Sequence, residues 1–291
     1  MQKWLKILLV ALGSLFALIG LAFTAVFFAM QFELLNVRGS IPARNAFFAA
    51  VGTSTAAVQI LPGVPAKPCL TEGTSACSWS QTPEWVVVAG GLSKDQAIIA
   101  RVESETGVSG RMIAAAVMPE QIRFFTSNRE VFKRYFEPLK VLGSLSQFSL
   151  GVSGIKQETA RKVEEYANDP SSPFYPGAEV ASLIAYAPGI ADRDAELYRR
   201  LTDDKDHYYS YLYTAVFMKE IAAQWSAYGF DISDNPEAMV TLFNIGFAKS
   251  NPNPNPQAGG APVSAGGQTY AFGQLGADFY HSDELLSLFG R

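Results

Sequence analysis

The feature that most limits how this chain can fold is an uncharged apolar run over residues 7–32. It exceeds the ~20 apolar residues that a helix needs to cross the hydrocarbon core of a bilayer. Lys3 and Lys6 precede the run and Glu33 follows it, so the positive-inside rule predicts a cytoplasmic N-terminus. The competing interpretation is a cleaved signal peptide, whose apolar region is normally only ~7–15 residues long. We therefore predict that residues 1–33 form a cytoplasmic tip and a single-pass signal anchor in the inner or cytoplasmic membrane.

This topology places the rest of the chain on the periplasmic or cell-wall side, where disulfides form. The two cysteines, Cys69 and Cys77, lie close together in a loop rich in proline, glycine, serine and threonine. A zinc site would need more ligands, and the only histidines, His207 and His281, are far away in the sequence. We predict a disulfide between Cys69 and Cys77 and no bound metal. Two unpaired thiols are the alternative.

Charge and local motifs exclude several other partners. The formal net charge is −4 and no cluster of lysine and arginine occurs, which argues against nucleic acid. No glycine-rich nucleotide-binding loop follows a clear strand, and no phosphate-binding Gly-Lys-Ser/Thr sequence is present. We therefore predict no cofactor.

Beyond the anchor, composition divides the chain into two parts. Residues 34–92 are rich in loop-forming residues and are predicted to be a stalk and lead-in. Residues 93–291 show helical periodicity and are predicted to form a mainly α domain. Its expected helices begin near 93 and then cover 108–125, 129–142, 157–168, 176–186, 192–202, 207–228 and 236–247. A long irregular loop is expected over 251–267, with a helical tail over 270–289.

A buried helix over residues 108–120 is expected to end at an acid. Its second half carries no charge before Glu120, and Pro119 is expected to kink the helix or to begin a new turn. A carboxyl group in an apolar setting tends to stay protonated, as a general acid requires. Glu120 is therefore the leading catalytic candidate. The alternative is a surface glutamate beside Arg123 or Arg129.

A small-residue segment follows, with the pattern Ser149-x-Gly151-x-x-Gly154-Ile-Lys-Gln157 and then Thr-Ala. Taken alone, it could be an ordinary connection between helices. The pattern resembles the loop Ser-x-x-Gly-x-x-Gly-Leu-x-Gln…Thr-Ala of the lytic transglycosylases and goose-type lysozymes. Residues 108–120 also resemble the helix Val-x-x-x-Leu-Ile-x-Ala-Ile-x-x-Glu that delivers the catalytic glutamate of this family.

A third element, Leu242-Phe-Asn244-Ile-Gly246, is similar to the Ala-Tyr-Asn-x-Gly element that lines the groove in the family. The three elements occur in the family's order. The chain departs from the pattern at Gln121, where the family usually has serine after the glutamate, and in the spacing around the small-residue loop. The resemblance thus implies a distant member with a lysozyme-like helical domain.

The resemblance also implies a mechanism with one carboxylate. Glu120 would protonate the bridging oxygen of the β-1,4 bond after N-acetylmuramic acid, while the substrate's own N-acetyl group stabilises C1. The same residue would then take the proton of the C6 hydroxyl, leaving a 1,6-anhydro end. Ordinary glycosidases need two carboxylates at a set separation. Glu130 and Glu137 are expected on a helix surface, and Glu158 lies in the next helix.

The predicted function is that of a membrane-anchored lytic transglycosylase that cleaves the glycan strands of peptidoglycan, with an envelope protein complex as a further candidate partner. The alternatives are a lysozyme-type muramidase and a non-catalytic scaffold that binds glycan or partner proteins. Tyr270 joins the site because it follows a glycine-rich loop, and loops near a cleft tend to carry function. The predicted site is catalytic Glu120 with substrate-binding Ser149, Gly151, Gly154, Gln157, Asn244 and Tyr270.

Overall fold

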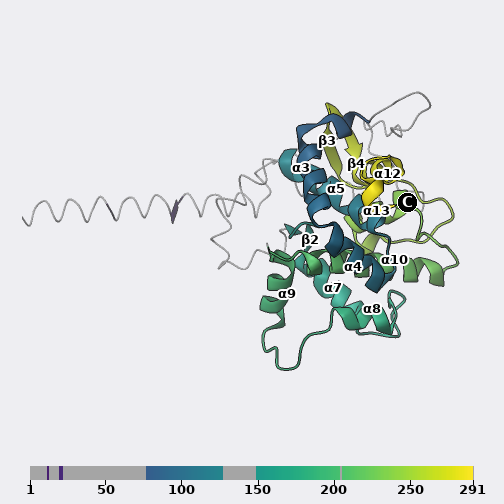
Figure 1. The fold of residues 1–291 in the computed structure, drawn as a ribbon. Helices are drawn as coiled ribbons and strands as arrows, with labels where there is room; N and C mark the ends of the chain where they lie inside the picture. Colours follow the sequence, from purple (N-terminus) through teal and green to yellow (C-terminus); the bar gives the residue numbers. More distant parts are fainter. Residues whose placement is uncertain (1–11, 13–19, 22–76, 127–148, 204, 291) are drawn as a thin grey trace, which may run out of the picture. The chain divides into compact units, whose positions relative to one another are not determined.

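The computed structural model describes residues 12, 20–21, 77–126, 149–203 and 205–290 (Figure 1). The predicted anchor lies almost wholly outside them, as does the predicted helix over 129–142. Among the described residues, no helix combines the length and apolar character needed to cross a membrane. The chain divides into two units, Met1–Ala50 and Val51–Arg291. Everything below concerns the second unit.

This unit is mainly helical, which confirms the predicted class, and its described residues form two sheets, each a two-stranded antiparallel hairpin. Most of the predicted helices are present with ends that shift by a few residues. The elements are η1 (Ser78–Gln81), α3 (Pro83–Lys94), α4 (Gln96–Thr106), α5 (Gly110–Thr126), β1 (Ser149–Leu150), β2 (Ile155–Lys156), α7 (Gln157–Ala167), α8 (Ala178–Leu183), α9 (Arg193–Thr202), α10 (Tyr208–Ala227), α11 (Pro236–Ile245), η4 (Phe247–Lys249), β3 (Pro262–Ala265), β4 (Gln268–Ala271), α12 (Phe272–His281) and α13 (Leu286–Phe289).

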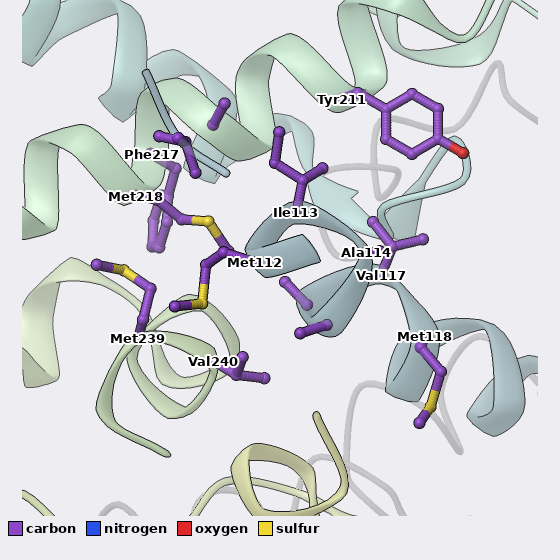
Figure 2. Packing of buried hydrophobic residues seen from close by; sticks show 14 of the residues in the cluster. Met112, Ile113, Ala114, Val117, Met118, Tyr211, Phe217, Met218, Met239 and Val240 are labelled. Atoms are coloured by element: carbon purple, nitrogen blue, oxygen red, sulfur yellow. The ribbon is translucent and has the colours of Figure 1, made fainter. Parts of the chain in front are cut away.

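The core forms around α5 and α10. Both helices are apolar around most of their circumference, which is typical of helices that neighbours cover on several sides. Helix α5 contacts α3, α10, α11 and α12. The aromatic residues of α10 pack in or against the core and are not exposed to solvent as a binding surface would be. Figure 2 shows one methionine from each of three helices, Met112, Met218 and Met239, within this core.

Helix α5 runs through Pro119 without ending, so of the two alternatives for this proline, the start of a new turn before Glu120 is wrong. Proline has no N–H to donate to the carbonyl of Ala115, four residues earlier. Gly276 of α12 lies against that carbonyl: a Cβ at this glycine would stand 2.5 Å from the Ala115 oxygen. Helix α12 therefore packs closely against the turn that lacks this hydrogen bond.

The folded unit begins earlier than predicted. Residues 77–92, which the sequence predicts to be part of the stalk and lead-in, form η1 and most of α3 and belong to the core. Trp79 packs edge-on against Trp85 with ring centroids 5.0 Å apart, and Trp85 lies 5.6 Å from the ring of Phe279 on α12. Cys77 is disulfide-bonded. Cys69, its predicted partner, lies outside the described residues.

The predicted irregular loop over 251–267 is also partly wrong, because its end forms a β-hairpin. Strand β3 pairs with β4 in the register Val263↔Tyr270 and Ala265↔Gln268. Gly266 and Gly267 make the two-residue turn with φ of 56° and 75°. Two successive positive φ angles are what a type I′ hairpin turn requires, and glycine adopts them at little cost.

Arg111 fixes the C-terminal end of α12 from inside the core. Its side chain is fully buried and donates to four backbone carbonyls: Nε to Tyr280 at 2.6 Å, Nη1 to Glu284 at 3.1 Å, and Nη2 to Phe279 at 2.9 Å and Ser282 at 2.5 Å. The last carbonyls of a helix have no partner within the helix, so this guanidinium supplies a donor that the Tyr280 carbonyl lacks. It also adds to the bonds that Ser282 donates to the Phe279 carbonyl.

Glu220 of α10 is a buried acid whose carboxyl oxygens have no hydrogen-bond partner among the described residues. Burial raises the pKa of Glu220 from its ordinary 4.5 to about 10. The unfolded chain loses this proton above about pH 4.5 while the folded chain keeps it, so stability falls as pH rises between these two values. We expect Glu220→Gln to be more stable than wild type at pH 9 and nearly equal to it at pH 5.

Urea unfolding at pH 5, 7 and 9 measures the difference in unfolding free energy between Glu220→Gln and wild type. This difference is expected to grow with pH, by up to about 1 kcal/mol per pH unit. Asp234→Asn, which changes an exposed acid, is the control and should track wild type. A gap that is the same at all three pH values would contradict a neutral, buried Glu220.

Candidate active site

The candidate acid lies on the last turns of α5. The Glu120 side chain is 13% exposed and forms an ion pair with Arg123, one turn later, whose side chain is 24% exposed. Nη2 of Arg123 lies 2.6 Å from Oε1 and 2.5 Å from Oε2 of the carboxylate. The pair with Arg123 matches the alternative interpretation of the sequence, although Glu120 is largely buried rather than on an open surface. Arg129, the other candidate partner, lies outside the described residues.

The small-residue segment is a β-hairpin and not a plain connection between helices. Ser149 pairs with Lys156 and Leu150 with Ile155, and residues 151–154 form the turn. Gly151 and Gly154 have φ of 62° and 65°, a conformation that favours glycine. The two glycines of the motif are therefore required by the backbone of this turn.

The hairpin turn packs directly against Glu120. A Cβ added at Gly154 would stand 2.2 Å from Cγ and 2.4 Å from Oε1 of Glu120, so only glycine permits this approach. The next residue on α5, Gln121, donates from Nε2 to the carbonyl of Val152 in the same turn. The structure thus brings together the predicted acid and the predicted glycine loop, which are 34 positions apart in the sequence.

The far side of the turn rests on α9 and α10. A Cβ at Gly151 would stand 2.1 Å from the carbonyl oxygen of Leu201, at the end of α9. The backbone N–H of Ser153 donates to Oγ of Ser210 on α10 at 3.3 Å, and the two hydroxyl oxygens are 3.1 Å apart. Sequence reasoning missed Ser153 and Ser210, because two single serines 57 positions apart give no local signal.

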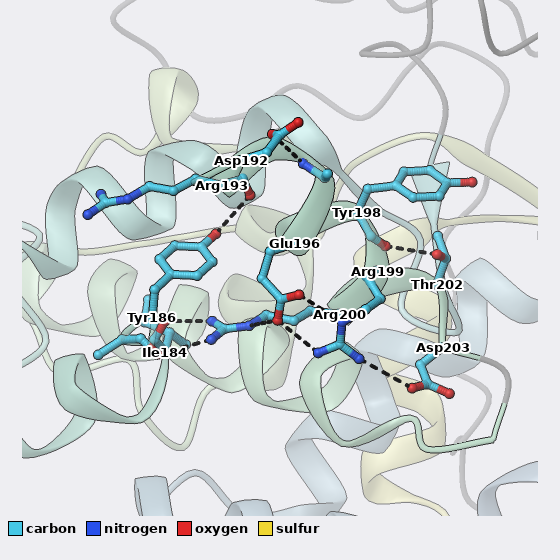
Figure 3. A network of polar contacts seen from close by, with 12 residues as sticks. Ile184, Tyr186, Asp192, Arg193, Glu196, Tyr198, Arg199, Arg200, Thr202 and Asp203 are labelled. Atoms are coloured by element: carbon cyan, nitrogen blue, oxygen red, sulfur yellow. Dashed lines mark hydrogen bonds and ion pairs between the residues drawn. The ribbon is translucent and has the colours of Figure 1, made fainter. Parts of the chain in front are cut away.

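A polar network holds α9 in this position (Figure 3). Arg200 is buried, donates to the carbonyls of Ile184 and Ala185, and has its guanidinium carbon 4.3 Å from the centre of the Tyr186 ring. Arg199 and Arg200 both bind Glu196, and hydrogen bonding to Arg199 is the main cause that lowers the pKa of Glu196 to about 2. These contacts tie the end of α8 to α9, and α9 carries the Leu201 carbonyl beneath the turn.

The other predicted substrate-binding residues lie in different settings. Gln157 begins α7 and its side chain reaches the carbonyl of Asp194 at 3.4 Å. Asn244, near the end of α11, accepts the N–H of Ala261 at 2.8 Å and so secures the segment before β3. Tyr270 is only 5% exposed and its hydroxyl lies 2.6 Å from Oγ of Ser78. Tyr270 was predicted to contact substrate, but in the structure it packs in the core.

Other chemical groups of the described region have structural roles. His207 immediately precedes α10, and its Nδ1 lies 2.6 Å from the buried carboxylate of Asp95. The described residues contain no cluster of histidine, cysteine and acidic side chains that could hold a metal ion. Of the candidate second carboxylates, Glu158 is exposed on α7, while Glu130 and Glu137 lie outside the described residues.

The contact between Gly154 and Glu120 predicts a specific mutational effect. Gly154→Ala and Gly107→Ala both place a side chain at a positive φ, which costs about 1 kcal/mol. A Cβ at Gly107 meets no atom within 4 Å, whereas one at Gly154 overlaps Glu120. We expect a loss of unfolding free energy of about 1 kcal/mol for Gly107→Ala and at least about 2 kcal/mol for Gly154→Ala. Equal losses in urea unfolding would contradict the close contact.

Comparisons of this chain with protein-family models, with curated proteins and with solved structures find no match. The candidate site therefore depends on its own geometry and on the sequence patterns that led to it.

Proposed function

We propose that this chain is a membrane-anchored lytic transglycosylase that cleaves the β-1,4 bond between N-acetylmuramic acid and N-acetylglucosamine in peptidoglycan. The observation that carries the proposal is the packing of the Gly154 turn against Glu120. The helix motif and the glycine-loop motif of one family pattern are distant in the sequence. They come into contact at Glu120, the residue that the pattern predicts to be catalytic. The apolar N-terminal run supports an extracytoplasmic site, where this polymer lies.

In the proposed reaction Glu120 works first as an acid and then as a base. Its proton passes to the bridging oxygen as the glycosidic bond breaks, and the substrate's N-acetyl oxygen stabilises the positive charge at C1. The carboxylate then takes the proton of the C6 hydroxyl as that oxygen bonds to C1. The hairpin turn would form a wall beside the scissile bond, because its Gly154 packs against the carboxylate.

The ion pair between Glu120 and Arg123 favours one competing function. A glutamate that serves only to bind an arginine would suit a non-catalytic scaffold that binds glycan or partner proteins. Incubation of the full chain with purified sacculi distinguishes the two functions. The proposal predicts release of soluble muropeptides, and a scaffold predicts binding to the sacculi without release.

A further inference from the structure

Arg123, which binds the candidate acid directly, is itself a recognition group. Arg123 places one guanidinium nitrogen within 2.6 Å of both oxygens of Glu120. Of the two side chains, that of Arg123 is the more exposed, at 24% against 13%. Glu120 is confined on another side by Gly154, which leaves no room for even one additional carbon. Of the pair, Arg123 is therefore the member that a ligand can reach more easily.

This pair conflicts with the first step of an acid-catalysed cleavage. A general acid must carry a proton, whereas a guanidinium binds a carboxylate that has lost one. The arrangement seen here is thus a resting state, and the reaction requires Arg123 to leave the carboxylate. A second carboxylate is the natural competitor, since the planar guanidinium matches that group with two parallel hydrogen bonds.

The proposed substrate carries such groups beside the scissile bond. The muramic acid unit has a lactyl substituent that ends in a carboxylate when no peptide is attached, and its stem peptide carries carboxylates when one is present. We propose that Arg123 recognises a carboxylate on the muramyl residue and, in binding it, releases Glu120 for protonation. Arg123 is then a positioning and specificity residue, and this role rests on the proposed function.

The test compares three substrates with one sugar backbone. They are strands stripped of peptide with free lactyl carboxylates, the same strands with the carboxylates converted to neutral amides, and strands with intact stem peptides. A charged hydrogen bond of about 1.5–3 kcal/mol corresponds to about 10- to 100-fold in kcat/KM. We expect wild type to prefer stripped strands over amidated strands by at least about tenfold. Intact strands show whether stem-peptide carboxylates serve as well as the lactyl group.

The variants separate recognition from plain packing. Arg123→Gln should remove the preference and should cleave amidated strands at least as fast as wild type, because Glu120 is no longer paired. Arg123→Lys should retain part of the preference. The matched control is Arg161→Gln, which should behave as wild type. It removes an exposed arginine of α7 that pairs with Asp194 of α9.

Two results would overturn the proposal. One is equal cleavage of stripped and amidated strands by wild type, and the other is an equal loss of both activities in Arg123→Gln. Calorimetric binding of both strands to wild type and Arg123→Gln provides a readout that does not need cleavage. If no substrate is cut, the proposed function fails, while a carboxylate preference in binding that disappears in Arg123→Gln still supports recognition by Arg123. If binding shows no preference for strands with free carboxylates, recognition by Arg123 is refuted.

Discussion

Glu120→Gln is expected to reduce the release of muropeptides from sacculi by about a thousandfold or more, while the protein stays folded. Glutamine has nearly the shape of the acid but can neither give nor take the proton, and one carboxylate serves both steps of the proposed reaction. The variant loses the ion pair with Arg123, but glutamine keeps the volume of the side chain, and its amide oxygen can still accept a hydrogen bond from the guanidinium. Activity should therefore disappear without a matching loss of structure.

Circular dichroism and urea unfolding of Glu120→Gln check that its fold remains. Glu158→Gln, a change of an exposed acid on α7, is the control for the loss of one negative charge and should retain activity. Undiminished turnover by Glu120→Gln would remove Glu120 from the catalytic role and, with it, the assignment of this site.

Arg111→Met is expected to lower the free energy of unfolding by about 4 kcal/mol or more. Methionine fills much of the same volume but donates no hydrogen bond, so the carbonyls of Tyr280, Ser282 and Glu284 lose their donor. The carbonyl of Phe279 keeps the N–H and the hydroxyl of Ser282. Each buried carbonyl left without a partner costs about 1–3 kcal/mol. The total is a large fraction of the ~5–15 kcal/mol that stabilises a typical domain.

The matched control is Arg161→Met, because Arg161 is 46% exposed and pairs with an exposed carboxylate. A surface pair of this kind contributes about 1 kcal/mol or less. Urea unfolding of the two variants should therefore differ by at least about 3 kcal/mol. Similar losses would show that the carbonyls near α12 find other donors and that Arg111 is not essential to this end of the fold.

Local sequence signals predicted the helices well where caps and periodicity agree. The helix expected from residue 236 begins there as α11, and its start has a recognisable signal: Asn235 precedes Pro236 and accepts the N–H of Ala238 as a helix cap should. Other features depend on contacts between distant residues. Helix α3 contains Gly90 and Gly91 and could not be placed from its own pattern, but Trp85 anchors it beside α12. The adjacent glycines Gly266 and Gly267 are a recognisable sequence signal for a hairpin turn, and the prediction of an irregular loop does not use this signal.

The candidate site was predictable only where a sequence motif indicated it. The resemblance linked Glu120 to the glycine turn, and the structure places Gly154 against that carboxylate. The support beneath the turn could not be foreseen, because the Leu201 carbonyl and Ser210 approach it only through the tertiary fold. Tyr270 was placed in the site by its position after a loop, and the β3–β4 pairing buries it instead.

The chemical nature of the new strand ends tests the central claim most directly. The full chain is incubated with purified sacculi, and the released fragments are weighed by mass spectrometry. Our account predicts 1,6-anhydro ends, lighter by one water than ordinary reducing ends, from wild type and not from Glu120→Gln. Reducing ends would show that water replaces the C6 hydroxyl, and sacculi left intact would show that the site does not cleave glycan. Either result would contradict a lytic transglycosylase.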